Sequence, residues 1–352
     1  MDEKLTNFWK ALNDTEFSPS DEKFLKLSKG AHFFGSDKKP SVLFIRKCYN
    51  DLLVPVLDKN IRNLRIMGNP GIGKTFYGYY LLYKLARSNT TVIYDNHINP
   101  QVILFEQKKA YNLDRIHHSY EISRYLDNPD VWRIVDGEIS NESEAKTILI
   151  CSPLKNNYKK FEKFSKPHIR FMPVWSWKEI DTCRSEIYKN LSSNYVRKLY
   201  DRWGGIPRYI LENALTIEIQ DQLQEAIDSC DERILDYIGG TESKKDISHK
   251  LIHIWTNIPD EDIINEAKSE AVSPFLTEGD EVEAEVNILT EEDEVLGDED
   301  NEREPYTKKI ILFASDFVGS QVTKKLKASI LNKLLLNLEG NLSNDPNLGH
   351  LF

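Results

Sequence analysis

The 352-residue chain is poor in cysteine and has no long hydrophobic run. Its four cysteines are far apart and form no Cys-x-x-Cys pair, which argues against structural zinc and favours reduced, mostly buried thiols. No apolar stretch approaches the roughly 20 residues that cross a bilayer, and the charged start at residues 1–5 has no apolar stretch after it. We therefore expect an intracellular protein without signal peptide, transmembrane helix or membrane partner.

Acidic residues are concentrated in one segment. Residues 278–304 hold 14 acidic residues and one basic residue, which gives this stretch a charge of −13. The net charge of the whole chain is −10, so the remaining residues sum to about +3. The tract is poor in apolar residues and is expected to be a solvated loop or disordered. The overall acidity is therefore a weak argument against a nucleic-acid partner.

The chain does contain ample material for a core. Hydrophobic residues make up 40%, including 15 Phe, 16 Tyr and 6 Trp, which excludes a mainly disordered protein. The length predicts about two domains.

A strand–helix rhythm begins near residue 62. Strands are predicted at 64–67, 91–94, 102–105 (in a small hairpin), 131–136, 147–151 and 169–174, with a helix at 75–86. This alternation is typical of an α/β fold with a parallel sheet flanked by helices. Helices are then predicted at 178–191, 194–203, 208–228, 234–237 and 247–255, followed by a strand at 309–313 and a helix at 320–337.

The chain is divided accordingly into five parts. The apolar spacing at 42–53 predicts a helix, so residues 1–60 are expected to be a helical N-terminal segment. A nucleotide-binding core follows at 61–176 and a helical lid at 177–275. The acidic insert spans 276–305 and a C-terminal α+β extension spans 306–352.

The strongest motif is a glycine-rich loop between a predicted strand and helix. It matches the full phosphate-loop pattern Gly-x4-Gly-Lys-Thr, in the run Gly68, Asn69, Pro70, Gly71, Ile72, Gly73, Lys74 and Thr75, followed by Phe76. Glycines let backbone N–H groups point at an anion, and the helix N-terminus favours phosphate. Lys74 supplies a mobile charge for the β- and γ-phosphates, and Thr75 a hydroxyl for Mg²⁺. The loop therefore predicts binding of a nucleoside triphosphate, most simply ATP with Mg²⁺.

A second acidic group is needed to hold the metal ion. Asp136 ends a predicted core strand and fits, although a turn-forming Asp is the alternative. Gly137 stands where many related hydrolases place a water-orienting Glu. Glu138 is therefore a candidate base, and an ordinary exposed Glu is nearly as good an explanation. Ser152 ends the next strand and is a candidate contact for the γ-phosphate, or simply a polar strand end.

The run from Gly204 to Arg208 forces a break between helices. Arg208 is placed unfavourably for the helix dipole unless an anion is near, so it is a candidate γ-phosphate sensor or a surface residue. His249 and His253 share a helical spacing without a third metal ligand, and the lysines at 159, 160 and 163 are best explained as a solvated helix face.

Three motifs together resemble the NTPase module of Crinkler effectors and the related retrotransposon hot spot proteins. They are the loop 68–75 with 78–82, the strand 132–137, and Gly204-Gly205-Ile206-Pro207-Arg208. The resemblance runs from about residue 33 to the C-terminus. It implies an ATPase core of the AAA or STAND-like type in effectors that act on DNA or with proteins in a host nucleus. It also implies a nuclease-like domain, which would begin about where this chain stops and is not carried over to these residues.

Three functions stay open from the sequence. The first is an ATPase or ATP-dependent switch using Lys74, Thr75, Asp136 and Arg208. The second is a nucleotide-bound interaction module that barely hydrolyses, and the third, weaker, is a small-molecule kinase. Nucleotide preference, oligomeric state and target are not predicted, and a basic residue from a neighbouring copy could complete the site.

Overall fold

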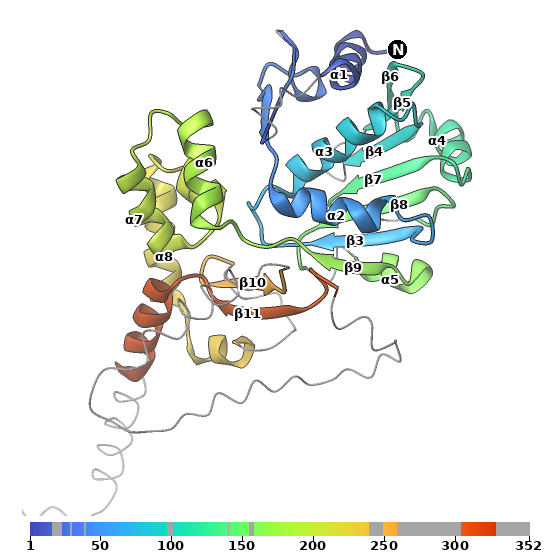
Figure 1. The fold of residues 1–352 in the computed structure, drawn as a ribbon. Coiled ribbons are helices and arrows are strands. Elements are labelled where there is room, and N and C mark those ends of the chain that lie inside the picture. Colours follow the sequence, from blue (N-terminus) through green and yellow to red (C-terminus); the bar gives the residue numbers. More distant parts are fainter. Residues whose placement is uncertain are drawn as a thin grey trace, which may run out of the picture.

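A computed structural model describes residues 1–15, 23–28, 30–38, 40–96, 101–139, 141–154, 158–238, 249–258 and 304–328. A seven-stranded sheet forms its centre, in the order β6-β5-β4-β7-β8-β3-β9 (Figure 1). The strands are β3 (Asn63–Met67), β4 (Val92–Asn96), β5 (Gln101–Glu106), β6 (Lys109–Asp114), β7 (Trp132–Asp136), β8 (Lys146–Cys151) and β9 (His168–Phe171). Strands β4, β7, β8, β3 and β9 run parallel, whereas β5 and β6 add an antiparallel hairpin at one edge. The predicted α/β class with a mostly parallel sheet is confirmed.

Helices cover both faces of this sheet. The register pairs Tyr94 with Ile134 and Ile134 with Ile148, and Ile150 follows two residues later, so their side chains share one face of the sheet. Helix α3 (Lys74–Ala86) lies on this face, where its Gly78 is close to Tyr94 and Ile150. Helix α1 (Glu3–Asp14) packs on the same face, where Trp9 stacks on Phe105 at 4.5 Å between ring centres. The opposite face carries α4 (Ser119–Leu126) and α5 (Lys159–Ser165). Burial on both faces explains why the central strands are continuous apolar runs.

The N-terminal segment differs from the helical prediction for residues 1–60. Besides α1 and α2 (Lys47–Leu57) it contains a two-stranded ribbon of β1 (Phe24–Lys26) and β2 (Val42–Phe44), and a 3-10 helix at Phe33–Gly35. The prediction of a helix over 42–53 was therefore wrong for its first residues. Strand β2 pairs with a distant segment, which the local spacing of apolar residues does not reveal.

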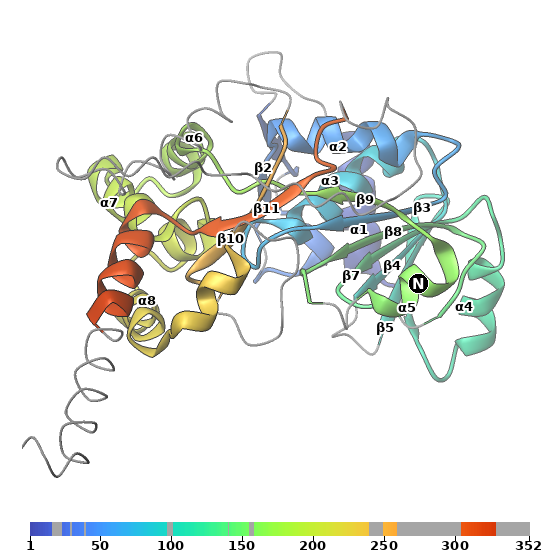
Figure 2. The same ribbon diagram turned by 90° about the horizontal axis from the view of Figure 1, so that it is seen from below.

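Helices then form a separate group beside the sheet, as Figures 1 and 2 show. They are α6 (Trp177–Ile187), α7 (Ser193–Trp203), a π-helix (Arg208–Glu212), α8 (Ile217–Ser229) and a 3-10 helix (Glu232–Tyr237). The single helix predicted over 208–228 was wrong, because the chain turns at residues 213–216 between two separate helices.

Two strands from distant parts of the chain form a second small sheet. Strand β10 (Ile252–Thr256) pairs antiparallel with β11 (Lys309–Phe313), and a helix follows at 316–328. The strand at 309–313 is confirmed, but the helix predicted over 247–255 was wrong, because residues 252–256 extend to pair with β11. Apart from Glu304, the acidic tract lies outside the described residues, as does the rest of the helix predicted over 320–337. In the described ranges no helix combines the length and apolar character needed to cross a membrane.

Candidate functional site

The glycine-rich loop joins the end of β3 to the start of α3, as predicted. Gly71 and Gly73 have φ of +84° and +93°, a region that favours glycine. A Cβ at Gly71 would lie 2.8 Å from the Cβ of Arg208, so the loop also needs glycine there because another residue passes so close. At Gly68, a Cβ would lie 2.5 Å from Ile72 Cδ1. The loop geometry therefore depends on all three glycines.

Lys74 begins α3 and its side chain folds back over the loop. Its ammonium group donates to the carbonyl oxygens of Gly68 at 2.8 Å and Asn69 at 2.7 Å. An ammonium has three N–H groups, so one donor remains for a third partner. Burial lowers the pKa of Lys74 from its ordinary 10.5 to about 8, partly offset by the nearby Cys151 and Asp136.

Two further carbonyls of the loop are held by aromatic side chains from outside it. The Trp175 indole Nε1 donates to Ile72 O at 2.8 Å, and the Tyr49 hydroxyl donates to Gly73 O at 3.0 Å. The carbonyls of residues 68, 69, 72 and 73 are thus all hydrogen-bonded inside the protein. Sequence reasoning missed Trp175 and Tyr49, because neither belongs to the motif.

The side chain of Asn69 is turned away from the loop. Its Nδ2 donates to Ile254 O and its Oδ1 accepts from Ile254 N, both at 2.9 Å, and Asn69 is almost fully buried. Asn69 was predicted as a phosphate-contacting residue. Its backbone still belongs to the loop, but its side chain joins the loop to β10.

Asp136 and Thr75 meet at the carboxyl edge of the sheet. The Thr75 hydroxyl donates to Asp136 Oδ2 at 2.9 Å, and the Tyr94 hydroxyl donates to the same oxygen at 3.1 Å. Burial and the nearby carboxylate raise the pKa of Tyr94, so it stays a protonated donor. The two residues predicted as Mg²⁺ ligands are therefore brought together, 61 positions apart in the chain.

The other predicted residues lie around this edge. Ser152 directly follows β8 and Glu138 lies two residues after β7, both half-buried. Gly137 has φ of +125° and donates its N–H to Ile150 O at 2.9 Å, so the chain turns there in a conformation that favours glycine. Phe76 is exposed in the first turn of α3, and Pro70 is half-buried at the loop tip. The roles of Glu138, Ser152 and Phe76 stay predictions.

The Gly204–Arg208 block lies directly against the loop. A Cβ at Gly205 would lie 2.0 Å from Trp175 O, and one at Gly204 2.1 Å from Ala314 O. The glycines are therefore required where the β9–α6 connection and the end of β11 converge. Arg208 starts the π-helix, is exposed, and passes beside Gly71.

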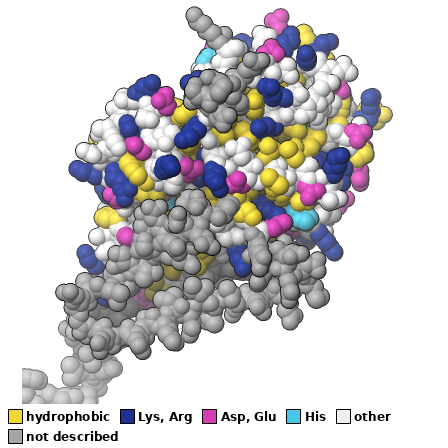
Figure 3. All heavy atoms as spheres, viewed as in Figure 1, with side chains coloured by type: hydrophobic (Ala, Val, Ile, Leu, Met, Phe, Trp, Pro, Cys, Tyr) yellow, Lys and Arg dark blue, Asp and Glu magenta, His cyan; other side chains and the backbone are white. Residues whose placement is uncertain are grey.

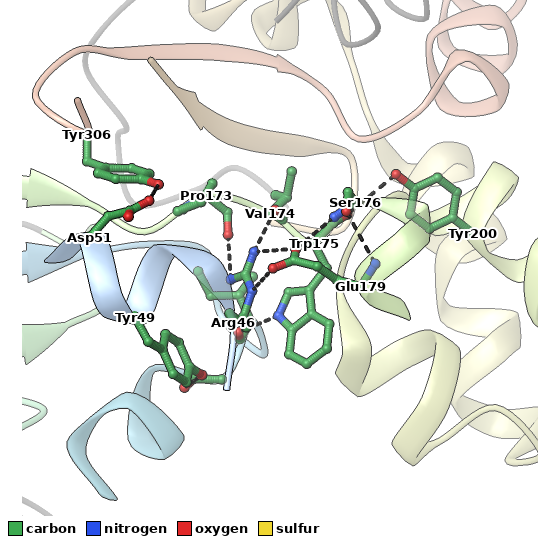
Figure 4. A network of polar contacts seen from close by, with 12 residues as sticks. Arg46, Tyr49, Asp51, Pro173, Val174, Trp175, Ser176, Glu179, Tyr200 and Tyr306 are labelled. Atoms are coloured by element: carbon green, nitrogen blue, oxygen red, sulfur yellow. Dashed lines mark hydrogen bonds and ion pairs between the residues drawn. The ribbon is translucent and has the colours of Figure 1, made fainter. Parts of the chain in front are cut away.

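A buried arginine fixes the connection between the sheet and the helical group. Arg46 donates to Pro173 O and Val174 O, each at 2.9 Å, and forms a two-point ion pair with Glu179 at 3.0 and 2.9 Å (Figure 4). Its guanidinium also lies 4.9 Å from the centre of the Trp175 ring. Arg46 therefore links α2, the β9–α6 connection and, through Trp175, the loop. Sequence reasoning missed it because its partners are 127 to 133 residues away.

The two histidines are not on one helical face. His253 lies in β10, fully buried, and neither ring nitrogen has a hydrogen-bond partner within the described ranges. Burial lowers its pKa to about 3, so it is neutral. His249 lies in a turn before β10 and its pKa is lowered by burial and by Lys74.

Comparison with known proteins gives two similar curated proteins, both from Phytophthora infestans. The chain is 27% identical to Crinkler effector protein 16 over 233 residues, which cover 62% of this chain and 36% of that protein. It is 26% identical to Crinkler effector protein 15 over 233 residues, 62% of this chain and 37% of that protein. The chain thus spans little more than a third of the length of these relatives. No protein-family model matches the sequence.

These similarities support the relationship to Crinkler effectors expected from the motifs. The relationship to retrotransposon hot spot proteins stays a prediction.

Proposed function

We propose that this chain binds a nucleoside triphosphate, ATP with Mg²⁺, on the loop 68–75 and acts as an ATPase or ATP-dependent switch. The observation that carries the proposal is the contact of Thr75 Oγ1 with Asp136 Oδ2 at 2.9 Å beside the Lys74 ammonium. A glycine-rich loop, the N-terminus of the helix that follows it and a lysine together favour phosphate oxygens. The hydroxyl and carboxylate beside them are oxygen ligands of the kind that Mg²⁺ prefers.

Each residue has a distinct part in this proposal. Lys74 uses its remaining N–H for the β- and γ-phosphates while two carbonyls hold its position. Thr75 and Asp136 hold Mg²⁺, which supplies charge neutralisation at the phosphates. Arg208 passes beside Gly71, which supports a role for its guanidinium at a phosphate and for the helical group as a lid.

A second candidate function is a nucleotide-bound interaction module with little hydrolysis. Gly137 favours this second function. Its φ of +125° suits a glycine directly after Asp136, so the position has no carboxylate that could orient a water molecule. Glu138 is then the remaining candidate base on β7's carboxyl side.

The similarity to Crinkler effectors extends the proposal to a biological role. We infer an NTPase module of a secreted effector that acts in a host nucleus. The face shown in Figure 3 has Lys and Arg interspersed with Asp and Glu, so it offers no broad basic surface for DNA. A DNA partner is proposed from the family resemblance.

The decisive binding experiment compares Lys74→Ala with wild type by titration with a fluorescent ATP analogue and Mg²⁺. We expect at least a hundredfold loss of affinity in Lys74→Ala and none in Lys178→Ala, which removes an exposed lysine of α6. Equal affinity of Lys74→Ala and wild type would refute nucleotide binding on this loop.

A second experiment separates the two candidate functions. Steady-state phosphate release is measured for wild type, Asp136→Ala and Glu138→Ala, with and without DNA. Turnover that falls in both variants supports an ATPase with Glu138 as base. Wild-type turnover no faster than that of the variants, with ATP binding intact, supports the interaction module.

A further inference from the structure

A cavity of about 290 Å³ opens beside the Asp136 edge, outside the glycine-rich loop. One wall is the sheet face at the ends of β4, β5 and β6. The other wall is the start of α1 and the turn at Phe34 and Gly35. Asp2 N donates to Ala110 O at 2.8 Å, which ties the N-terminal wall to β6.

The sheet wall carries a row of carboxamides. Tyr94 pairs with Ile103, and Ile103 pairs with Asn112, so these residues project to one face of the sheet. Alternation along β4 and β5 places Asn96 and Gln101 on that same face. All of them line the cavity. Three side-chain amides, each with donors and an acceptor, therefore share one wall.

The remaining lining adds one partly accessible aromatic ring and no net charge. Phe34 is aromatic and half-buried, and its ring centre lies 4.7 Å from that of Tyr94. Tyr94, Leu5 and Ile103 also line the cavity but are almost fully buried. Asp2 and Lys4 contribute one charge of each sign. A wall without net charge gives no preference for phosphate, whereas an aromatic ring beside amides suits a planar ligand with hydrogen-bonding edges.

The backbone at Phe34 is held in an unusual conformation. Its φ of 53° lies in the left-handed region, which disfavours a residue with a bulky side chain. Gly35 follows with φ of +63°, and a Cβ there would lie 2.7 Å from Lys4. The tight turn holds the Phe34 ring in the cavity wall. Such outliers cost on the order of 1–3 kcal/mol and gather at ligand sites.

We propose that this cavity binds a nucleobase. Asn and Gln amides pair with the donor and acceptor edges of bases, and bases stack on aromatic rings. The cavity volume is close to the roughly 300 Å³ at the lower end for ligand pockets, which suits a base with its ribose. The source is either a free nucleoside or an unstacked base of a single strand. The cavity lies outside the glycine-rich loop, and its Tyr94 wall touches Asp136 of the site proposed for ATP.

The test measures nucleoside binding by isothermal titration calorimetry. It uses the Lys74→Ala variant, so that binding on the glycine-rich loop does not compete with binding in the cavity. Adenosine, guanosine, cytidine and uridine are titrated up to about 5 mM. We expect one of them to bind, and Asn112→Leu to weaken that binding at least tenfold. Asn194→Leu, at an exposed position of α7, is the matched control and should change nothing. ATP affinity is measured separately in Asn112→Leu with Lys74 intact and should equal that of wild type.

Each outcome decides one point. No nucleoside binding, or binding that Asn112→Leu leaves unchanged, overturns the proposal even if ATP binds to the loop. Glucose is titrated as a polar ligand without a base, and binding of glucose but of no nucleoside also overturns the proposal. A single-stranded hexanucleotide that binds tenfold tighter than the nucleoside, with the same dependence on Asn112, identifies a strand as the source, and equal or weaker binding identifies the free nucleoside.

Discussion

Lys74 gives the proposed site a pH dependence. Because burial lowers its pKa to about 8, the folded protein loses this positive charge at a pH where a free lysine keeps it. We expect ATP affinity to fall about tenfold per pH unit above pH 8. In Lys74→Arg the charge persists, so any affinity that remains should be flat from pH 7 to 9.5. A flat wild-type profile would contradict the prediction.

The same shift affects stability with a defined sign. Between pH 8 and 10.5 the unfolded chain binds more protons at Lys74 than the folded chain does. The contribution of this residue to the free energy of unfolding therefore rises with pH across that window.

Asn69 is expected to matter for stability more than for phosphate binding. Asn69→Ala leaves the N–H and C=O of Ile254 without their side-chain partners, and each buried unsatisfied group costs about 1–3 kcal/mol. We expect a loss of about 2–4 kcal/mol in urea unfolding, while the loop keeps its backbone N–H groups. Asn194→Ala serves as an exposed control. A loss below about 0.5 kcal/mol would show that water replaces the amide.

The position of the loop between β3 and α3 was predictable from sequence, because the motif is local. The partners that hold the loop were not. Tyr49 lies 24 residues from Gly73, Trp175 lies 103 from Ile72, and Ile254 lies 185 from Asn69. Only the folded chain brings them together.

At the scale of elements, the pair of Arg46 and Glu179 sets how the helical group meets the sheet. Arg46→Met leaves two carbonyl oxygens without this donor and removes the charged partner of the Glu179 carboxylate, which keeps the N–H of Ser176. Removing one side of a buried pair costs about 3–5 kcal/mol, and since Glu179 is 20% exposed we expect the lower end.

A double-mutant cycle with Glu179→Gln isolates the pair from the carbonyl contacts. The losses of unfolding free energy in the two single variants should add up to more than the loss in the double variant, because both single variants remove the same ion pair. Thermal unfolding of the four proteins gives the coupling. Simple additivity would show that Arg46 acts through the carbonyls of residues 173 and 174 alone.

Element types followed from sequence wherever a strand repeats an apolar run or a helix has an apolar face, as in β3, β7, β8, α3 and α7. The predictions were wrong where pairing with a distant strand determines the type of element. Residues 252–256 have apolar positions that also fit a helix, and β11, more than 50 residues away, makes them a strand. Strand β6 was not predicted, because Lys109, Asn112 and Asp114 make the segment largely polar and it lies at the edge of the sheet.

At the scale of the molecule, β10 and β11 should hold together without most of the chain between them. Asn257 Nδ2 donates to Glu304 O at 2.7 Å, so the two ends of the intervening stretch lie side by side. We expect replacement of residues 261–302 by six Gly/Ser residues to leave ATP affinity within about twofold, since loop closure varies only slowly with length. Circular dichroism checks the fold. A tenfold loss of affinity with the fold intact would give the acidic tract a part in binding.

Hydrogen bonds hold four carbonyls of the glycine-rich loop, and they determine whether the loop becomes ordered on folding or on ligand binding. A loop that is free before binding must be ordered by its ligand, which lowers affinity. Here Lys74, Trp175 and Tyr49 have already ordered the loop during folding. The loss of loop entropy therefore falls on folding, and the phosphate of the proposed ligand would not have to order the loop.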